Sequence, residues 1–124
     1  MTVQTGTIVG IGKIVMRPLP QVIPPLSFMV IKNEVYTAVC IELNISVDAP
    51  SEQEVVAKLV SSCNAGIKQL FELVGDEAWD NLEALFNDLQ PNSRYIKAFN
   101  AAQLTLAQKG VRLSSDEECC YHSL

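Results

Sequence analysis

The stretch VYTAVCIELNISVDAPSEQE, residues 35–54, changes its hydrophobic period from that of a strand to that of a helix. Residues 35–48 alternate apolar and polar side chains, which predicts β-structure. A typical strand has only about 5–6 residues, so we expect a break near residues 42–44 and two strands. A helix begins directly afterwards. This order of elements predicts an α+β fold in which a helix packs across a small antiparallel sheet.

The alternation assigns the side chains of this stretch to two faces of the sheet. One face, predicted to lie on the core, carries Val35, Thr37, Val39, Ile41, Leu43, Ile45 and Val47. The other, predicted to face solvent or a partner, carries Tyr36, Ala38, Cys40, Glu42, Asn44, Ser46 and Asp48. Tyr36, Ala38 and Cys40 make the second face less polar near its start. Both an interface and an ordinary half-buried sheet surface fit this pattern.

The start of the helix is predicted by a capping box. Ser51 is followed three residues later by Glu54, so each side chain can accept a hydrogen bond from the backbone N–H of the other. Apolar residues then recur at helical spacing on one broad face. They are Val55, Val56, Leu59, Val60, Cys63, Ile67, Leu70, Phe71 and Val74. Gly75 stands where such a helix would end.

Before this stretch, the chain predicts two strands separated by a proline-rich segment. Residues 7–16 are rich in β-branched residues, and residues 26–31 read as a second strand followed by a tight turn at 32–34. The intervening segment RPLPQVIPPL cannot be helical, because proline removes backbone donors. We expect it to be an extended arm that lies over its own domain or over a neighbouring subunit.

After residue 75, the pattern predicts two further helices. The second helix begins near Asp76 and ends at Pro91, and the third runs from about Ser93 to Lys109 and is closed by Gly110. Residues 111–115 predict a short final strand, and the polar tail is expected to be disordered.

These elements predict one domain over residues 1–124, with a sheet of three or four strands. Its parts are an N-terminal strand and proline-rich arm (1–25), a strand-strand-strand-helix core (26–74), a helical extension (75–113) and a disordered tail (114–124).

Net charge and cysteine content limit the class of partner and the cellular compartment. The chain carries 14 acidic and 9 basic residues, a formal charge of −5. An acidic surface repels phosphate backbones, which disfavours nucleic acid as a partner and suits a basic protein. No apolar run approaches the ~20 residues of a membrane helix. The N-terminus lacks a signal-peptide pattern, and the four cysteines do not form a disulfide framework, so we predict a cytoplasmic protein.

The sequence predicts no catalytic, cofactor-binding or metal-binding residues. Gly10 and Gly12 lack the following helix that a dinucleotide site needs, so we interpret them as allowing a bend in a strand. Cys119, Cys120 and His122 supply only part of a zinc ligand set, and they stand near the chain terminus. Since His122 is the only histidine, no serine–histidine–acid triad can be built elsewhere.

Two aromatic residues on the second predicted helix are further interface candidates. Trp79 and Phe86 are seven positions apart and share one helix face. They can pack in the core or form a hot spot on a partner surface, where tryptophan is enriched.

The segment YTAVCIELNISVDAPSEQEVVAKLVSSCNAGIKQLFE resembles the HicB-like antitoxin fold. Glu42-Leu43 stands at the family's Pro-Glu-Leu-like element, and Ser51 to Glu54 stands at its Thr-x-Glu-Glu helix start. The resemblance covers about residues 26–74 and departs from the family at Ile41, where proline is usual, and at 48–50, where a glycine commonly precedes the cap.

This resemblance implies a non-enzymatic protein-binding module, antitoxin-like, that holds a small basic toxin-like protein. We expect it to form a homo-oligomer, a dimer or larger, without a cofactor. The predicted partner interface comprises Tyr36, Ala38, Cys40, Glu42, Trp79 and Phe86. The alternative is a small-ligand-binding protein or an enzyme, with carboxylates in a cleft between sheet and helices. A third alternative is DNA binding through the C-terminal helices.

Overall fold

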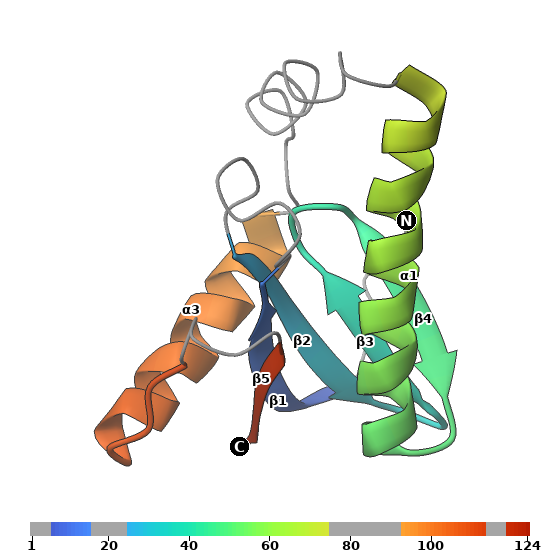
Figure 1. The fold of residues 1–124 in the computed structure, drawn as a ribbon. Coiled ribbons are helices and arrows are strands. Elements are labelled where there is room, and N and C mark those ends of the chain that lie inside the picture. The colour runs from blue at the N-terminus through green and yellow to red at the C-terminus, as the bar shows by residue number, and fades with distance from the viewer. Residues whose placement is uncertain (1–5, 16–24, 75–92, 114–118) are drawn as a thin grey trace.

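The computed structural model describes residues 6–15, 25–74, 93–113 and 119–124. Its strands are β1 (Thr7–Ile14), β2 (Leu26–Lys32), β3 (Tyr36–Cys40), β4 (Ile45–Ala49) and β5 (Cys119–Ser123), and its helices are α1 (Glu52–Val74) and α3 (Ser93–Gln108). The strands form one antiparallel sheet in the order β4-β3-β2-β1-β5 (Figure 1). The α+β class is confirmed, but the sheet has five strands, not the three or four predicted. The described ranges contain two helices, and the helix predicted from Asp76 lies outside them.

The predicted break in the long alternating stretch is confirmed. β3 ends at Cys40, residues 41–44 form a turn, and β4 begins at Ile45. Asn44 adopts a φ of 53° in this turn. Asparagine tolerates this left-handed conformation better than most residues, which lets the chain reverse direction there.

Residues 119–123 of the C-terminal tail form strand β5, so the prediction of disorder is wrong for them, and residues 114–118 lie outside the described ranges. β5 pairs with β1 from Gly10↔Ser123 to Ile14↔Cys119. Without β5, β1 would present a row of unpaired backbone groups at the sheet edge, and pairing satisfies them. The strand predicted at 111–115 is also absent at residues 111–113, while residues 114 and 115 lie outside the described ranges.

Helix α1 begins as its sequence predicts. The Glu54 backbone N–H donates to the Ser51 Oγ at 3.2 Å, which is the first half of the capping box. Val55, Leu59 and Cys63 lie one turn apart and are fully buried against the sheet. The amphipathic spacing therefore places this helix on the sheet, as expected.

Helix α3 ends where Gly110 was predicted to close it. Gly110 has a φ of +80°, a conformation that glycine adopts without a steric penalty. The Gly110 N–H donates to the Ala107 carbonyl at 3.0 Å, and the Val111 N–H donates to the Leu106 carbonyl at 2.9 Å. These two bonds form a Schellman motif, which satisfies carbonyl groups at the helix end.

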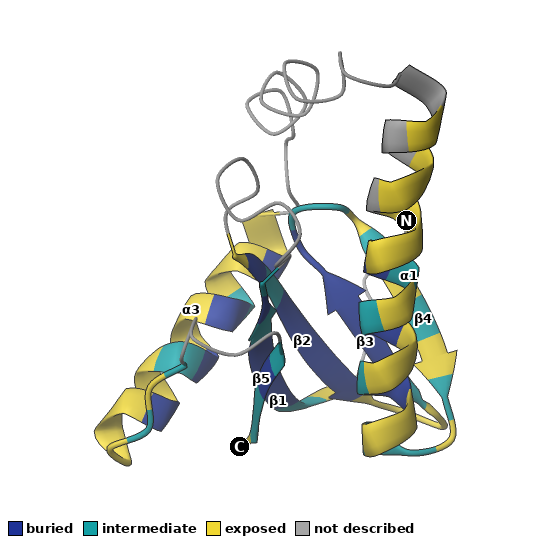
Figure 2. Cartoon of the chain, viewed as in Figure 1, coloured by how far each residue is buried: buried dark blue, intermediate teal, exposed yellow. Residues whose placement is uncertain are grey.

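The two helices cover opposite faces of the sheet, so the fold has two cores (Figures 1 and 2). The core between α1 and the sheet consists of Ile14, Leu26, Phe28, Val30, Ala38 and Cys40 from the sheet and Val55, Leu59 and Cys63 from α1. The core on the other side consists of Ile11, Met29, Ile31, Val39 and Ile41 together with Tyr95, Phe99, Ala102 and Leu106 from α3. Tyr36, Ala38 and Cys40, predicted to point toward solvent or a partner, lie on the face that α1 covers. The prediction of one continuous face is wrong beyond the turn at 41–44, because Ile45 and Val47 pack on the α1 side while Ser46 and Asp48 are exposed on the other. The central strands bury both faces because a helix lies on each side.

Candidate functional site

Four of the six predicted interface residues lie within the described ranges. Ala38 and Cys40 are fully buried beneath α1, so their side chains form no exposed surface. Tyr36 is half-buried at the start of β3, with the Lys32 Nζ 5.6 Å from its ring centroid. Trp79 and Phe86 lie outside the described residues, and their role stays a prediction.

Glu42, the fourth of these residues, lies under α3. Its Oε1 accepts a hydrogen bond from the Ser27 backbone N–H at 2.7 Å. Burial raises the pKa of the Glu42 carboxyl, and this hydrogen bond and the charge of Lys13 lower it by less. Glu42 also lines a pocket of about 280 Å³ between the sheet and α3. The other lining residues are Lys13, Ser27, Ile41, Ile96, Phe99, Asn100 and Gln103.

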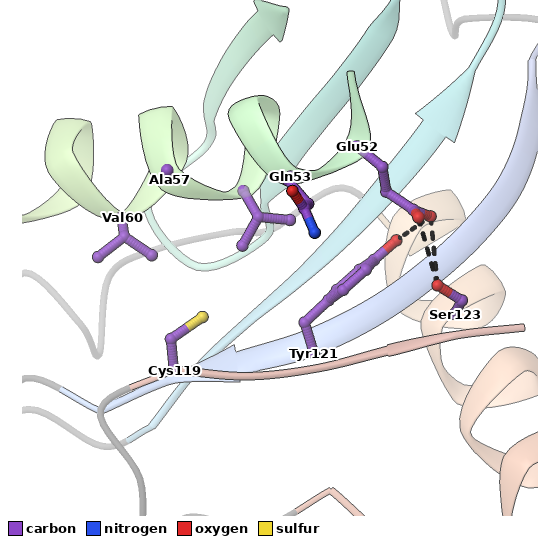
Figure 3. A pocket seen from close by; sticks show the side chains of 8 residues that line it. Glu52, Gln53, Ala57, Val60, Cys119, Tyr121 and Ser123 are labelled. Atoms are coloured by element: carbon purple, nitrogen blue, oxygen red, sulfur yellow. Dashed lines mark hydrogen bonds between the residues drawn. The ribbon is translucent and has the colours of Figure 1, made fainter.

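A larger pocket of about 570 Å³ lies between α1 and β5 (Figure 3). At one end, the Glu52 carboxylate accepts a hydrogen bond from the Tyr121 hydroxyl at 2.7 Å. The Ser123 hydroxyl lies 3.3 Å from Glu52 Oε2 and 3.5 Å from Oε1. A residue of the helix start and two residues of the C-terminal strand thus form one polar cluster.

The remainder of this pocket is mostly apolar. Figure 3 shows Val60 and Cys119 at the end away from Glu52, with the Cys119 sulfur pointing toward α1. Val56, Ala57 and Gln53 complete the lining. Of the lining residues that the structure describes, Glu52 alone is charged, so this part of the pocket has an apolar end and a negatively charged end.

Two glycines of β1 make room for the aromatic side chains beside this pocket. A Cβ on Gly10 would collide with the Tyr121 phenol, and a Cβ on Gly12 would collide with the Phe28 ring and the Cys120 carbonyl. The Phe28 and Tyr121 rings stack with centroids 5.8 Å apart and an interplanar angle of 13°. The aromatic rings therefore cover the backbone that the glycines leave bare.

The environment of Tyr121 keeps its hydroxyl protonated. Burial raises the pKa of the Tyr121 phenol most, and the hydrogen bond and the negative charge of Glu52 raise it further. A protonated phenol is a hydrogen-bond donor, so it holds the Glu52 carboxylate in place at the N-terminus of α1.

The cysteines and the histidine do not converge on a metal site. β5 presents Cys119 and Tyr121 to α1, and strand alternation directs Cys120 and His122 to the opposite face. Within the described residues, no group of three His, Cys, Asp or Glu side chains is placed to hold a metal ion.

Cys40 and Cys63 meet in the core between β3 and α1. Both side chains are fully buried. The hydrogen bond that the Cys40 thiol donates to Cys63, together with burial, raises the pKa of Cys40, and the same hydrogen bond lowers the pKa of the accepting Cys63 thiol. Since neither side chain is exposed to solvent, neither is placed to attack a substrate.

The sequence did not predict the pocket between α1 and β5, because the residues of β5 that line it were predicted to belong to a disordered tail. The residues Cys119, Tyr121 and Ser123 alternate with Cys120 and His122. This alternation, together with a tyrosine, is a strand signal that is only five residues long. Tyr121 and Ser123 then reach Glu52, 69 and 71 residues earlier in the chain.

Comparison with known proteins adds no family. The chain matches no protein-family model, no curated protein and no solved structure. In the described ranges, no helix is both long and apolar enough to cross a membrane.

Proposed function

We propose that this protein is a non-enzymatic protein-binding module of HicB-like type, antitoxin-like, which binds a small basic partner along strand β4. The observation that carries the proposal is the position of β4 at an end of the sheet. In the described part of the chain, β4 pairs with β3 alone. Such a strand has outward backbone N–H and C=O groups that an added strand can use. The Asp48 carbonyl of β4 already accepts a hydrogen bond from Lys58 Nζ at 3.0 Å, which an added strand would have to replace at that position.

The side chains of β4 fit strand addition. Ile45, Val47 and Ala49 are half-buried and pack against the core beneath α1. Ser46 and Asp48 are exposed on the other face, because α3 covers β1 and β2 rather than β4. An added strand would therefore find apolar contacts on one face and polar contacts on the other.

The charge of the chain favours a basic partner. Its formal charge is −5, and Asp48 is exposed on β4 itself. Complementary charge speeds association and discriminates against acidic partners more than it adds affinity. The resemblance of residues 26–74 to HicB-like antitoxins supports the same class of partner, a small basic toxin-like protein.

A matched pair of lysine substitutions tests the binding edge. Ser46→Lys puts a positive charge on exposed β4, and edge lysines oppose strand addition. Ser61→Lys makes the same change at an exposed position of α1. We expect the tagged wild-type protein and Ser61→Lys to capture a stoichiometric small basic protein from native lysate, releasable by high salt. Ser46→Lys should lose it.

Equal capture by all three proteins would place the interface elsewhere. Capture of no basic protein would reject the antitoxin-like function. The homo-oligomer that the sequence predicts is measured in parallel by light scattering on the purified chain. Pure self-association that Ser46→Lys abolishes would assign β4 to contacts between copies of this chain.

The alternative function, a ligand-binding protein, is favoured by one specific observation. The carboxylates of Glu42 and Glu52 each line a pocket between the sheet and a helix. The larger of these pockets has a carboxylate held by hydrogen bonds at one end and apolar side chains at the other.

A further inference from the structure

We propose that the pocket between α1 and β5 binds a small organic amine, with its ammonium group on Glu52 and its hydrocarbon chain along Val56, Ala57 and Val60. This site is separate from the β4 edge. Its volume of about 570 Å³ falls within the range of roughly 300–1,000 Å³ that is usual for small-molecule sites.

Counting partners among the described residues, the polar end of the pocket has acceptor sites to spare. A carboxylate offers about four lone-pair sites. Tyr121 and Ser123 each have one hydroxyl proton, so together they fill two of these sites on Glu52. The two hydroxyl groups also fix the orientation of the carboxylate, so a ligand would not have to order it.

The charge of the lining selects the kind of head group. Glu52 carries a carboxylate, and no lysine or arginine stands among the described residues that line the pocket. An ammonium group would gain a charge-assisted hydrogen bond there. A carboxylic acid of the same size would meet like charge, and an alcohol would gain only a neutral hydrogen bond.

The opposite end of the pocket selects an apolar chain. Val56 and Val60 are half-buried, and Ala57 is exposed beside them on the same helix. A hydrocarbon chain lying along these side chains would bury apolar surface, which supplies most of the affinity of such sites.

Three probes of equal chain length test the inference, namely hexylamine, hexanol and hexanoate. Each is titrated into the full chain and followed by calorimetry and by amide NMR shifts. We expect hexylamine to bind most tightly and hexanoate most weakly, with shifts centred on residues 52–60 and 119–123. Equal binding of hexanoate, or no binding of hexylamine at millimolar concentration, would overturn the proposal.

Two pairs of variants locate the site. Glu52→Gln should weaken hexylamine binding by about tenfold or more and remove its advantage over hexanol. Glu54→Gln, an exposed acid in the same helical turn that does not line the pocket, should leave binding unchanged. Ala57→Trp should fill the pocket and abolish binding, whereas Ala65→Trp on exposed α1 should not. Unchanged binding by Glu52→Gln or by Ala57→Trp would contradict the assignment.

Discussion

At the scale of single residues, the missing side chain of Gly10 decides where Tyr121 lies. The phenol occupies the space that a Cβ on Gly10 would need, and from there its hydroxyl reaches Glu52. Gly12 plays the same part for Phe28. The sequence predicts a strand bend at both glycines, and the structure has an irregularity only beside Gly10, where the β1–β2 register shifts between Ile8 and Gly10, while Gly12 pairs in regular register with Phe28. The contact of Gly10 with Tyr121 depends on the pairing of β5 with β1, which could not be predicted from the sequence.

Gly10→Ala should lower the free energy of unfolding by about 1–3 kcal/mol, because the new methyl group overpacks against Tyr121. Gly66→Ala is the control, since its nearest neighbour is Ile45 Cδ1 at 3.9 Å. Inside α1 this change should raise the free energy of unfolding by up to about 1 kcal/mol. Urea unfolding measures both. If Gly10→Ala lowers the free energy of unfolding in a Tyr121→Leu background by as much as in the wild type, Tyr121 does not occupy the space above Gly10.

The raised pKa of Glu42 predicts a pH dependence. The folded state binds the Glu42 proton more tightly than the unfolded state, whose pKa is near the ordinary 4.5. The stability that this group contributes is therefore complete below pH 4.5 and is lost as the pH rises through the raised pKa. The free energy of unfolding of the wild type minus that of Glu42→Gln should fall across this window. A flat or rising difference in urea unfolding from pH 4 to 8 would contradict the buried position of Glu42.

At the scale of elements, the ends of helices and strands that depend on neighbouring residues could be predicted, whereas a short strand that pairs with a distant segment could not. The break at residues 41–44, the Ser51 cap and the Gly110 stop each depend on residues close in sequence, and all three are confirmed. β5 has only five residues, and its pairing with β1 joins segments about 110 residues apart. A short strand at a chain end has too little pattern to be distinguished from a disordered tail.

Removing residues 119–124 tests whether β5 belongs to the folded core. The deletion leaves β1 at the sheet edge and removes the buried Cys120 and the ring stacked on Phe28. We expect a loss of roughly 3 kcal/mol or more in the free energy of unfolding, as for large core truncations. Tyr121→Phe, which loses only the hydroxyl, should cost about 1 kcal/mol. A truncated chain as stable as the full chain would restore the disordered-tail prediction.

At the scale of the whole molecule, the sheet is the middle layer between two helices. The sequence indicated a single covered face, because residues 35–48 alternate so regularly. β2, with its four consecutive buried residues, carries the signal for two covered faces. A short apolar run of this kind does not say which elements cover it. Which helix lies on which face depends on tertiary packing.

The layer arrangement predicts a contrast between two leucines. Leu59 on α1 is fully buried, whereas Leu104 on α3 is 62% exposed. Leu59→Asp places an unpaired charge in the core and should unfold the chain, since the penalty approaches the whole stability of a small domain. Leu104→Asp should change the free energy of unfolding by no more than about 0.5 kcal/mol. A soluble, cooperatively melting Leu59→Asp protein would contradict the packing of α1.

The central functional claim is that a basic partner adds a strand to β4. Amide hydrogen exchange on the captured complex, compared with the free chain, tests it most directly. Strand addition would engage the outward amides of residues 45–49, so we predict that their exchange slows on binding while that of residues 119–123 on the other sheet edge stays the same. Unchanged exchange at residues 45–49 in a complex of confirmed stoichiometry would contradict the claim.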